Sequence, residues 1–341
     1  MSKPSLGRLT ILAPVPYPTP NFAPIWLAEI LGYGAEEGLD LNVELSDNPK
    51  TSVNAVVAGK GDMTFVNIVF SLLQRDEGIP FVPFYAFVRV QNRAFSVPKD
   101  SPIKSLSDLR GKTVGLHYDD PELFQFARAA LIGAGVNPDT EVSFKPLPGS
   151  PLDGPRMAKA LRDGDVQAVW QLDVLAGFLE VEGVPVRLLP APAIDRLTPS
   201  SCLETLDDRL KARPEAYAAV GRAVAKATLF AITNPEAAIR LMWKTYPGTA
   251  PRAGDDPARV LRRELAALKV RLAGHRIDGA RVPKWGAISR QEMVDWQDFL
   301  LSTKAIKTRR DPAIYYSDAL VAQFNAFDPA PVIASAKNFK V

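Results

Sequence analysis

Strands and helices alternate along the first part of the chain, and this alternation constrains the fold more than any other feature of the sequence. Apolar or alternating runs at Arg8–Val15, Leu39–Leu45 and Met63–Val66 predict strands. Helices are predicted between and after them, over Phe22–Glu37 and Ile68–Asp76. Strands that alternate with helices of about a dozen residues are typical of βαβ units. We therefore predict an α/β fold with a largely parallel sheet.

A second series of the same kind begins near Gly111. The apolar run Thr113–Leu116 is followed by a polar cluster, and Asp120-Pro121 then opens a helix that ends near Gly133. Further strands are predicted at Glu141–Lys145, Val166–Gln171 and Pro185–Leu189, with a helix at Pro155–Asp163. The segments 54–67 and 157–171 both read as a helix, Gly-Asp, a buried strand and a polar end. This weak internal echo favours two similar lobes.

Two proline- and serine-containing stretches are predicted to connect the lobes. Pro80–Val97 is aromatic and β-branched, and we predict one long strand running out of the first lobe. Pro98–Pro102 and Thr198–Ser201 then mark the two crossovers. We expect residues 1–97 and 198–341 to form the first lobe and residues 98–197 to form the second.

The rest of the chain is predicted to be mainly helical. The expected helices are Pro214–Thr233, Pro235–Tyr246, Ala258–Ala273, Arg290–Thr303 behind a capping box of Ser289 and Glu292, and Asp311–Phe327. Arg262, Arg263, Lys269 and Arg271 lie on one of these helices, and we expect them to form a solvated face.

Composition excludes several classes of function. The net charge is +3 and the basic residues are spread along the chain, so the basic stripe of a nucleic-acid-binding protein is missing. Cys202 is the only cysteine and His117 and His275 are the only histidines, which excludes an intramolecular disulfide and a Cys/His zinc site. Gly111-Lys112-Thr113 precedes its strand, whereas a phosphate-binding loop would follow one. We predict no metal, no cofactor and no catalytic residue.

Four stretches in this order carry a family resemblance: AGKGDM (58–63), SLSDLRGKTVGL (105–116), ALRDGDVQAVW (160–170) and the run RPEAYAAVGRAVAKATLFAITNPEAAIRLM from Arg213. Together they resemble the solute-binding proteins of ABC importers, in the branch that binds thiamine pyrimidine precursors, taurine and other sulfonates, and nitrate. The resemblance implies a two-lobe type II periplasmic-binding fold, in which each lobe is a mixed, mostly parallel sheet flanked by helices and the C-terminal region is helical. It also implies that a small ligand is held between lobes that close by hinge rotation.

The resemblance further implies partners and a location. The expected partners are a small-molecule ligand and the membrane subunits of an importer, and a monomer is expected. Importer proteins of this kind carry an export signal, but the apolar run Leu9–Ala13 is too short for a signal core or a membrane span. We expect a periplasmic protein, with a cytoplasmic location as the alternative.

Candidate ligand contacts follow from one rule: ligands of open α/β sheets bind at the carboxyl ends of the strands. The first strand leads to Tyr17, Asn21 and Phe22, and the third to Asn67, although Asn21 and Asn67 are equally suited to cap helices. The remaining candidates are Arg89 on the connecting segment, His117, Tyr118 and Asp119 after the second lobe's first strand, and Gln171 and Asp173 after Trp170.

The charges near Pro121 bear on the ligand class. A bare helix N-terminus would favour a sulfonate or nitrate, but Asp119, Asp120 and Glu122 already occupy this region. These carboxylates favour a neutral or cationic ring, such as an aminopyrimidine stacked between aromatic side chains.

Two alternatives to a binding protein stay open. The same branch includes fungal pyrimidine-synthesising enzymes, which use a cysteine cluster with iron, and Cys202 alone has no counterpart to that cluster. An enzyme on this scaffold, pyrimidine-synthase-like or dehydratase-like, would use His117 with Asp119 or Asp173 for proton transfer. A cytosolic ligand sensor is the third alternative.

Overall fold

Two β-sheets organise the chain, and each belongs to its own unit. The computed structural model describes residues 5–116, 121–147, 154–278 and 282–340. The first unit contains Met1–Arg89, Pro199–Gly254 and Leu272–Val341, and the second contains Val90–Thr198 and Asp255–Arg271. Residues 90–97 and 255–271, which the sequence places with the first lobe, therefore cluster with the second unit.

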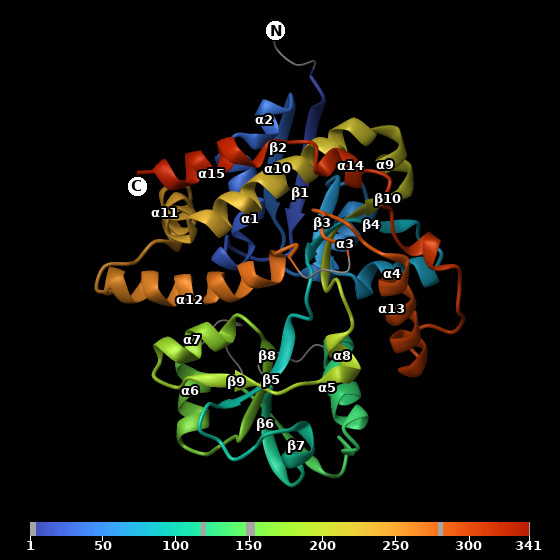
Figure 1. The fold of residues 1–341 in the computed structure, drawn as a ribbon. Coiled ribbons are helices and arrows are strands. Elements are labelled where there is room, and N and C mark those ends of the chain that lie inside the picture. The colour runs from blue at the N-terminus through green and yellow to red at the C-terminus, as the bar shows by residue number, and fades with distance from the viewer. Residues whose placement is uncertain (1–4, 117–120, 148–153, 279–281, 341) are drawn as a thin grey trace. The chain divides into compact units, whose positions relative to one another are not determined.

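The sheet of the first unit has, in the described residues, the strand order β2-β1-β3-β10-β4 (Figure 1). Its strands are β1 (Gly7–Ala13), β2 (Leu39–Leu45), β3 (Met63–Asn67), β4 (Phe81–Val88) and β10 (Ser201–Leu206). β1 runs parallel to β2 and β3, while β10 runs antiparallel between β3 and β4. Every residue of β4 is buried, as expected for a strand whose two faces are both covered.

Helices cover this sheet. They are α1 (Ala23–Ile30), α2 (Tyr33–Glu36), α3 (Pro49–Val57), α4 (Val69–Asp76), α9 (Asp207–Ala212), α10 (Pro214–Thr233), α11 (Pro235–Thr245), α13 (Arg290–Ser302), α14 (Val321–Phe324) and α15 (Pro329–Asn338), with short 3₁₀ turns at Pro20–Phe22, Pro247–Thr249 and Pro312–Tyr315. α10 is rich in buried alanine and packs against α1 and α15. The capping box of Ser289 and Glu292 at the start of α13 is confirmed.

The sheet of the second unit repeats the same plan. Its strand order in the described residues is β7-β6-β8-β5-β9, and its strands are β5 (Arg93–Pro98), β6 (Lys112–Leu116), β7 (Val142–Pro146), β8 (Ala168–Leu172) and β9 (Val186–Leu188). β6 runs parallel to β7 and β8, and β5 runs antiparallel between β8 and β9. β3 and β8 thus hold equivalent places, which explains the internal echo in the sequence.

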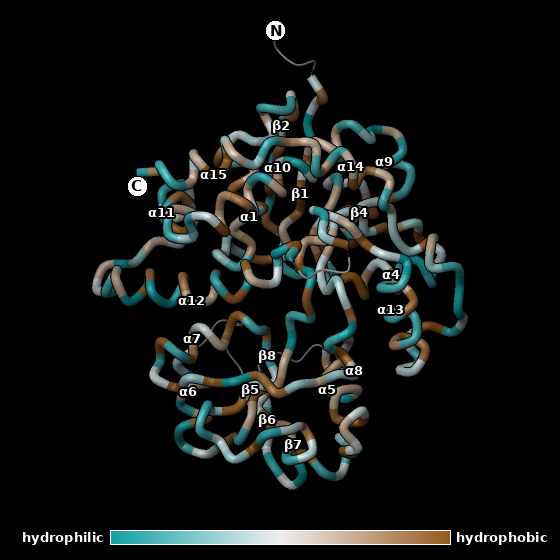
Figure 2. Tube along the Cα trace, in the orientation of Figure 1, coloured by the Kyte–Doolittle hydropathy of each residue, from teal (hydrophilic) through white to brown (hydrophobic). Residues whose placement is uncertain are grey.

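In the described part of residues 90–198, four α-helices flank this sheet, and a fifth comes from later in the chain. α6 (Gly154–Arg162) and α7 (Leu175–Val181) lie on one side, and α5 (Pro121–Gly133) and α8 (Pro192–Asp195) lie on the other (Figure 1). α12 (Pro257–His275) is part of this unit as far as Arg271, and Ala267 joins the apolar core of α6 and α7. Hydrophobic and hydrophilic residues alternate along α12 in Figure 2, in keeping with its one buried face. Among the described residues, no helix is long and apolar enough to cross a bilayer.

The expectation of one long strand over Pro80–Val97 is wrong. The residues 89–92, of which all but Val90 are polar, divide this stretch into β4 and β5, which pair in different sheets. The sequence also misses β10, because its pattern includes Glu204, a residue that strands rarely bury.

Two predicted helices are also wrong in extent. Phe22–Glu37 is divided into α1 and α2 because Gly32 adopts a positive φ of 70°. Asp311–Phe327 contains only a 3₁₀ turn and α14, since Tyr316 is extended, and the sequence misses α15, which Asp328 caps.

The close packing of α7 on α12 generates a test. A Cβ added to Gly177 would lie 2.6 Å from the backbone carbon of Ala266 and 2.7 Å from the nitrogen of Ala267. At an open helical position a Gly→Ala change stabilises by up to ~1 kcal/mol, whereas overpacking costs about 1–3 kcal/mol. Gly177→Ala should therefore lower the free energy of unfolding measured in urea. Gly248→Ala is the control, because no described atom lies within 4 Å of its added Cβ, and an increase in stability for Gly177→Ala would contradict the packing.

Candidate ligand-binding edges of the two units

In each sheet, one edge collects the carboxyl ends of the parallel strands and the start of the inserted antiparallel strand. In the first unit, Asn67 at the end of β3 pairs with Ser201 at the start of β10. In the second, Leu172 at the end of β8 pairs with Arg93 at the start of β5. Side chains from these strand ends are therefore neighbours within each unit, at the place where α/β sheets bind ligands.

Aromatic rings gather at this edge of the first unit. The ring centroid of Phe22 lies 4.8 Å from that of Phe65 and 6.5 Å from that of Phe87. His275, at the end of α12, contacts Phe87 edge-on at 4.3 Å. We call Phe22, Phe65, Phe87 and His275 the aromatic wall; its partly exposed member is Phe22, while the other three are buried. Such a group of rings offers a face on which a flat ligand can stack.

Polar candidates lie on the same strand ends. Asn21 is buried and does not cap α1, whose N-cap position is Phe22, so its capping role in the sequence interpretation is wrong. The side-chain oxygen of Asn67 accepts a hydrogen bond from the backbone of Val69 at 3.1 Å, but the N-cap position of α4 is Ile68, so the expected capping by Asn67 is wrong. Tyr17, in the loop after β1, is 44% exposed.

Arg89 contacts the backbone of its own unit. Its guanidinium donates to the carbonyl oxygens of Ala287 at 2.9 Å and Val282 at 3.1 Å. Burial lowers the pKa of Arg89, and the nearby Glu292 partly offsets this. These contacts give Arg89 a structural role in holding residues 282–287; a contact with ligand stays a prediction.

The polar residues after β8 form a buried network in the second unit. Asp173 Oδ1 accepts a hydrogen bond from Val174 N at 2.8 Å and forms an ion pair with Arg271 Nη2 at 2.8 Å, and Asp173 N donates to Asn92 O at 3.0 Å. Gln171 is fully buried and donates to Ser96 Oγ at 2.8 Å. Gln171 and Asp173 are therefore buried within the second unit and do not form a surface turn.

Arg271 is the residue that the sequence interpretation misplaced. It was expected on a solvated face of α12, but its exposed fraction is 1%. Burial raises the pKa of Asp173, and the Arg271 charge opposes that rise. The spacing of Arg271 from Glu264, Ala267 and Leu268 on the buried face of α12 is the signal that could have placed it inside.

Three predicted site residues, His117, Tyr118 and Asp119, lie outside the described residues, as does Asp120. The structure therefore does not test the role of His117 and Asp119 in proton transfer, or the effect of these carboxylates on ligand charge.

The described residues offer little for covalent chemistry. Cys202 is fully buried in β10, and burial raises the pKa of its thiol, so it is a poor nucleophile. Glu204 is also fully buried, with Oε2 accepting a hydrogen bond from the hydroxyl of Ser71. Within the described part of the chain, no three His, Cys, Asp or Glu side chains are placed to hold a metal ion.

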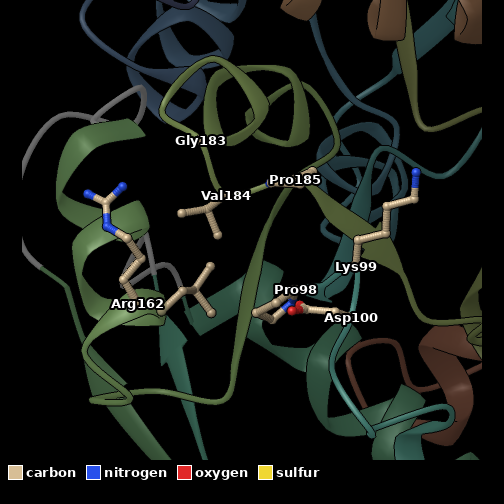
Figure 3. Close-up of a pocket in the computed structure, with 8 residues that line it drawn as sticks. Pro98, Lys99, Asp100, Arg162, Gly183, Val184 and Pro185 are labelled. Carbon is tan, nitrogen blue, oxygen red and sulfur yellow. The ribbon is translucent and has the colours of Figure 1, made fainter.

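A surface groove of about 690 Å³ lies elsewhere in the second unit (Figure 3). Its lining residues are Pro98, Lys99, Asp100, Leu161, Arg162, Gly183, Val184 and Pro185. Because β5 is antiparallel to β8, Pro98 lies at the amino ends of the parallel strands. The groove is thus at the opposite edge of the sheet from the Asp173 network.

Comparison with known proteins gives the family. Residues 19–238 match the model of the family described as NMT1/THI5 like. The chain belongs to the NMT1/THI5-like family. Among curated relatives, this NMT1/THI5-like protein is 25% identical over 254 residues to the 4-amino-5-hydroxymethyl-2-methylpyrimidine phosphate synthase THI12 of Saccharomyces cerevisiae, with 70% of each chain covered. It is 28% identical over 138 residues to the riboflavin-binding protein RibY of Chloroflexus aurantiacus, covering 40% of this chain and 39% of RibY.

Solved structures give the fold of the NMT1/THI5-like protein. The periplasmic aliphatic sulphonate binding protein SsuA of Escherichia coli superposes with a TM-score of 0.64 at 17% identity, covering 91% of this chain and 92% of SsuA. The expected type II periplasmic-binding fold is therefore confirmed, as is the branch that the sequence resembles.

The buried carboxyl of Glu204 generates a pH prediction for this NMT1/THI5-like protein. Burial raises the pKa of Glu204 well above its ordinary value of 4.5, so the folded state keeps a proton that the unfolded chain has lost. The free energy of unfolding should then fall as pH rises above 4.5, by at most ~1.4 kcal/mol per pH unit. Glu204→Gln should flatten this dependence in urea unfolding between about pH 5 and 7. Glu236→Gln, at an exposed position, is the control, and an unchanged slope in Glu204→Gln would contradict the assignment.

Proposed function

We propose that the protein is a solute-binding protein that captures a small heteroaromatic molecule and presents it to the membrane subunits of an ABC importer. The aromatic wall is the observation that carries this proposal. Phe22 offers a partly exposed ring backed by Phe65 and Phe87, and Asn67 lies on the neighbouring strand end. An aminopyrimidine suits this arrangement, because its ring can stack on Phe22 while the polar side chains beside Phe22 bind its nitrogen atoms.

The relatives support the same ligand class. The yeast relative is named for a pyrimidine product, and the Chloroflexus relative is named for riboflavin, so both names concern nitrogen heterocycles. The structural neighbour SsuA is named as a periplasmic binding protein. On this basis we propose a periplasmic location and an importer partner for the chain, and we expect it to act as a monomer.

Ligand contacts from both units would supply the mechanism. We propose that Tyr17, Asn21, Phe22 and Asn67 contribute from the first unit, and that Gln171, Asp173, His117, Tyr118 and Asp119 contribute from the second. A ligand that contacts both units binds the closed state more tightly than the open state. The free energy by which it stabilises the closed state equals the difference between its binding free energies for the two states. The importer would then recognise the closed form.

An enzyme is the second candidate, because the yeast relatives are named as synthases. The buried, raised-pKa thiol of Cys202 argues against a cysteine-dependent reaction in this chain. The enzyme would instead depend on His117 with Asp119 or Asp173. Turnover of a bound aminopyrimidine, abolished by His117→Ala, would favour the enzyme over the binding protein.

The proposal predicts a specific loss of affinity on removing one ring. Loss of a stacked aromatic ring costs about 1–3 kcal/mol, so Phe22→Ala should weaken binding of 4-amino-5-hydroxymethyl-2-methylpyrimidine roughly 10- to 100-fold in titration calorimetry. Phe339→Ala is the matched control, since Phe339 is also partly exposed and contacts one ring, that of Phe230, on the α10–α15 helix pair. Equal affinity in wild type and Phe22→Ala, or no binding to wild type, would contradict the proposal.

A further inference from the structure

Arg271 is a fully buried cation, and only one of its guanidinium nitrogens has a polar partner among the described residues. Its Nη2 forms an ion pair with Asp173 Oδ1 at 2.8 Å. Among the described residues, its Nε and Nη1 have no hydrogen-bond partner. A guanidinium presents its donors as a rigid planar fork, so a contact through Nη2 alone leaves the Nε and Nη1 donors available to a ligand.

Polar side chains on the two segments that lead to Asp173 share this feature. Gln91 Nε2, Asn92 Oδ1 and Gln171 Oε1 are also buried and have no partner within the described part of the chain. The backbone bond from Asp173 N to Asn92 O, at 3.0 Å, brings the segment 91–93 to Asp173. Gln171 lies two residues before Asp173, on β8. Buried polar groups are almost always paired in folded proteins, so unpaired ones on segments that meet at Asp173 are what a binding site for a polar group would show.

The charges at this place favour an anion. Burial raises the pKa of Asp173, and the charges of Arg271 and Arg93 both oppose that rise. Of these two guanidinium groups, that of Arg271 is fully buried and keeps donors without a described partner. A planar fork of N–H donors binds an oxyanion through two parallel hydrogen bonds. The acceptor oxygens of Asn92 and Gln171 suit hydroxyl or amine groups beside that anion.

We propose that Arg271, with Gln91, Asn92, Gln171 and Asp173, forms a subsite of the second unit for an oxyanion carried by the ligand, such as a phosphate. The ligand of the proposed function would then be an anionic derivative of a heteroaromatic molecule. This inference rests on the proposed function for the heteroaromatic part only. It revises the expectation of a neutral or cationic ligand, which was drawn from Asp119, Asp120 and Glu122.

The test compares two ligands that differ by one phosphate. Calorimetry should measure the affinities of 4-amino-5-hydroxymethyl-2-methylpyrimidine and its phosphate ester. Wild type should bind the phosphate ester at least about tenfold more tightly, because charge-assisted hydrogen bonds contribute more than neutral ones. Arg271→Gln should lose this preference, by about 10- to 100-fold in affinity for the ester, and Arg271→Lys should keep part of it.

Two further variants separate the subsite from general effects. Arg262→Gln removes the same charge from an exposed position of α12 and should leave the preference unchanged. Asp173→Asn removes the competing carboxylate but keeps an acceptor for Arg271, so it should tighten binding of the ester. If Arg271→Gln fails to fold, Asp173→Asn and Arg271→Lys still move the preference in opposite directions.

The outcomes distinguish this subsite from the proposed function. Equal binding of both pyrimidines to wild type would overturn the subsite and leave the proposed function standing. If neither pyrimidine binds, inorganic phosphate is the deciding probe. Saturable phosphate binding that weakens in Arg271→Lys would then support the subsite without the proposed function, and no phosphate binding would overturn both.

Discussion

Each sheet depends on one strand that runs against its neighbours. β10 lies between β3 and β4, and β5 lies between β8 and β9, so the hydrogen-bond ladders of both sheets are continuous only when these strands are inserted. β10 follows residues of the second unit in the chain, and β5 follows residues of the first. The chain therefore passes through the second unit before β10 completes the first sheet, and it leaves the first unit before β5 enters the second sheet. The same insertion brings Ser201 to Asn67 and Arg93 to Leu172, at the edges where ligand contacts are expected.

The two edges differ in chemistry. The first unit presents rings, with Phe22 partly exposed in front of buried Phe65 and Phe87. The second presents buried charge, with Arg271 held by Asp173. Stacking tolerates many flat ligands, whereas buried donors discriminate strongly against ligands that leave them unpaired. Under our proposals, the first unit selects a ring and the second selects the group attached to it.

Much of the fold could be predicted from local sequence. The range Leu39–Leu45 for β2 and the range Pro214–Thr233 for α10 were predicted to the residue, because alternation in one and a proline start in the other are local signals. β10 and the division at Arg89–Asn92 could not be predicted in this way. Both depend on pairing with strands far away in the chain, and β10 also contains the buried Glu204.

The site was less predictable than the fold. Asn67, Gln171 and Asp173 were predicted from their places at or after strand ends, and each lies at the expected edge of its own sheet; their contact with a ligand stays a prediction. Arg271 was missed because charge on a helix normally means solvent, and its partner Asp173 is nearly a hundred residues earlier in the chain. Long-range ion pairs of this kind leave no local pattern in the sequence.

A crystal structure with the pyrimidine phosphate bound tests the central claim most directly. Our account predicts the ring against Phe22 and the phosphate within hydrogen-bonding distance of Arg271. A ligand found in the groove beside Pro98 and Arg162, or a phosphate directed away from Arg271, would contradict it.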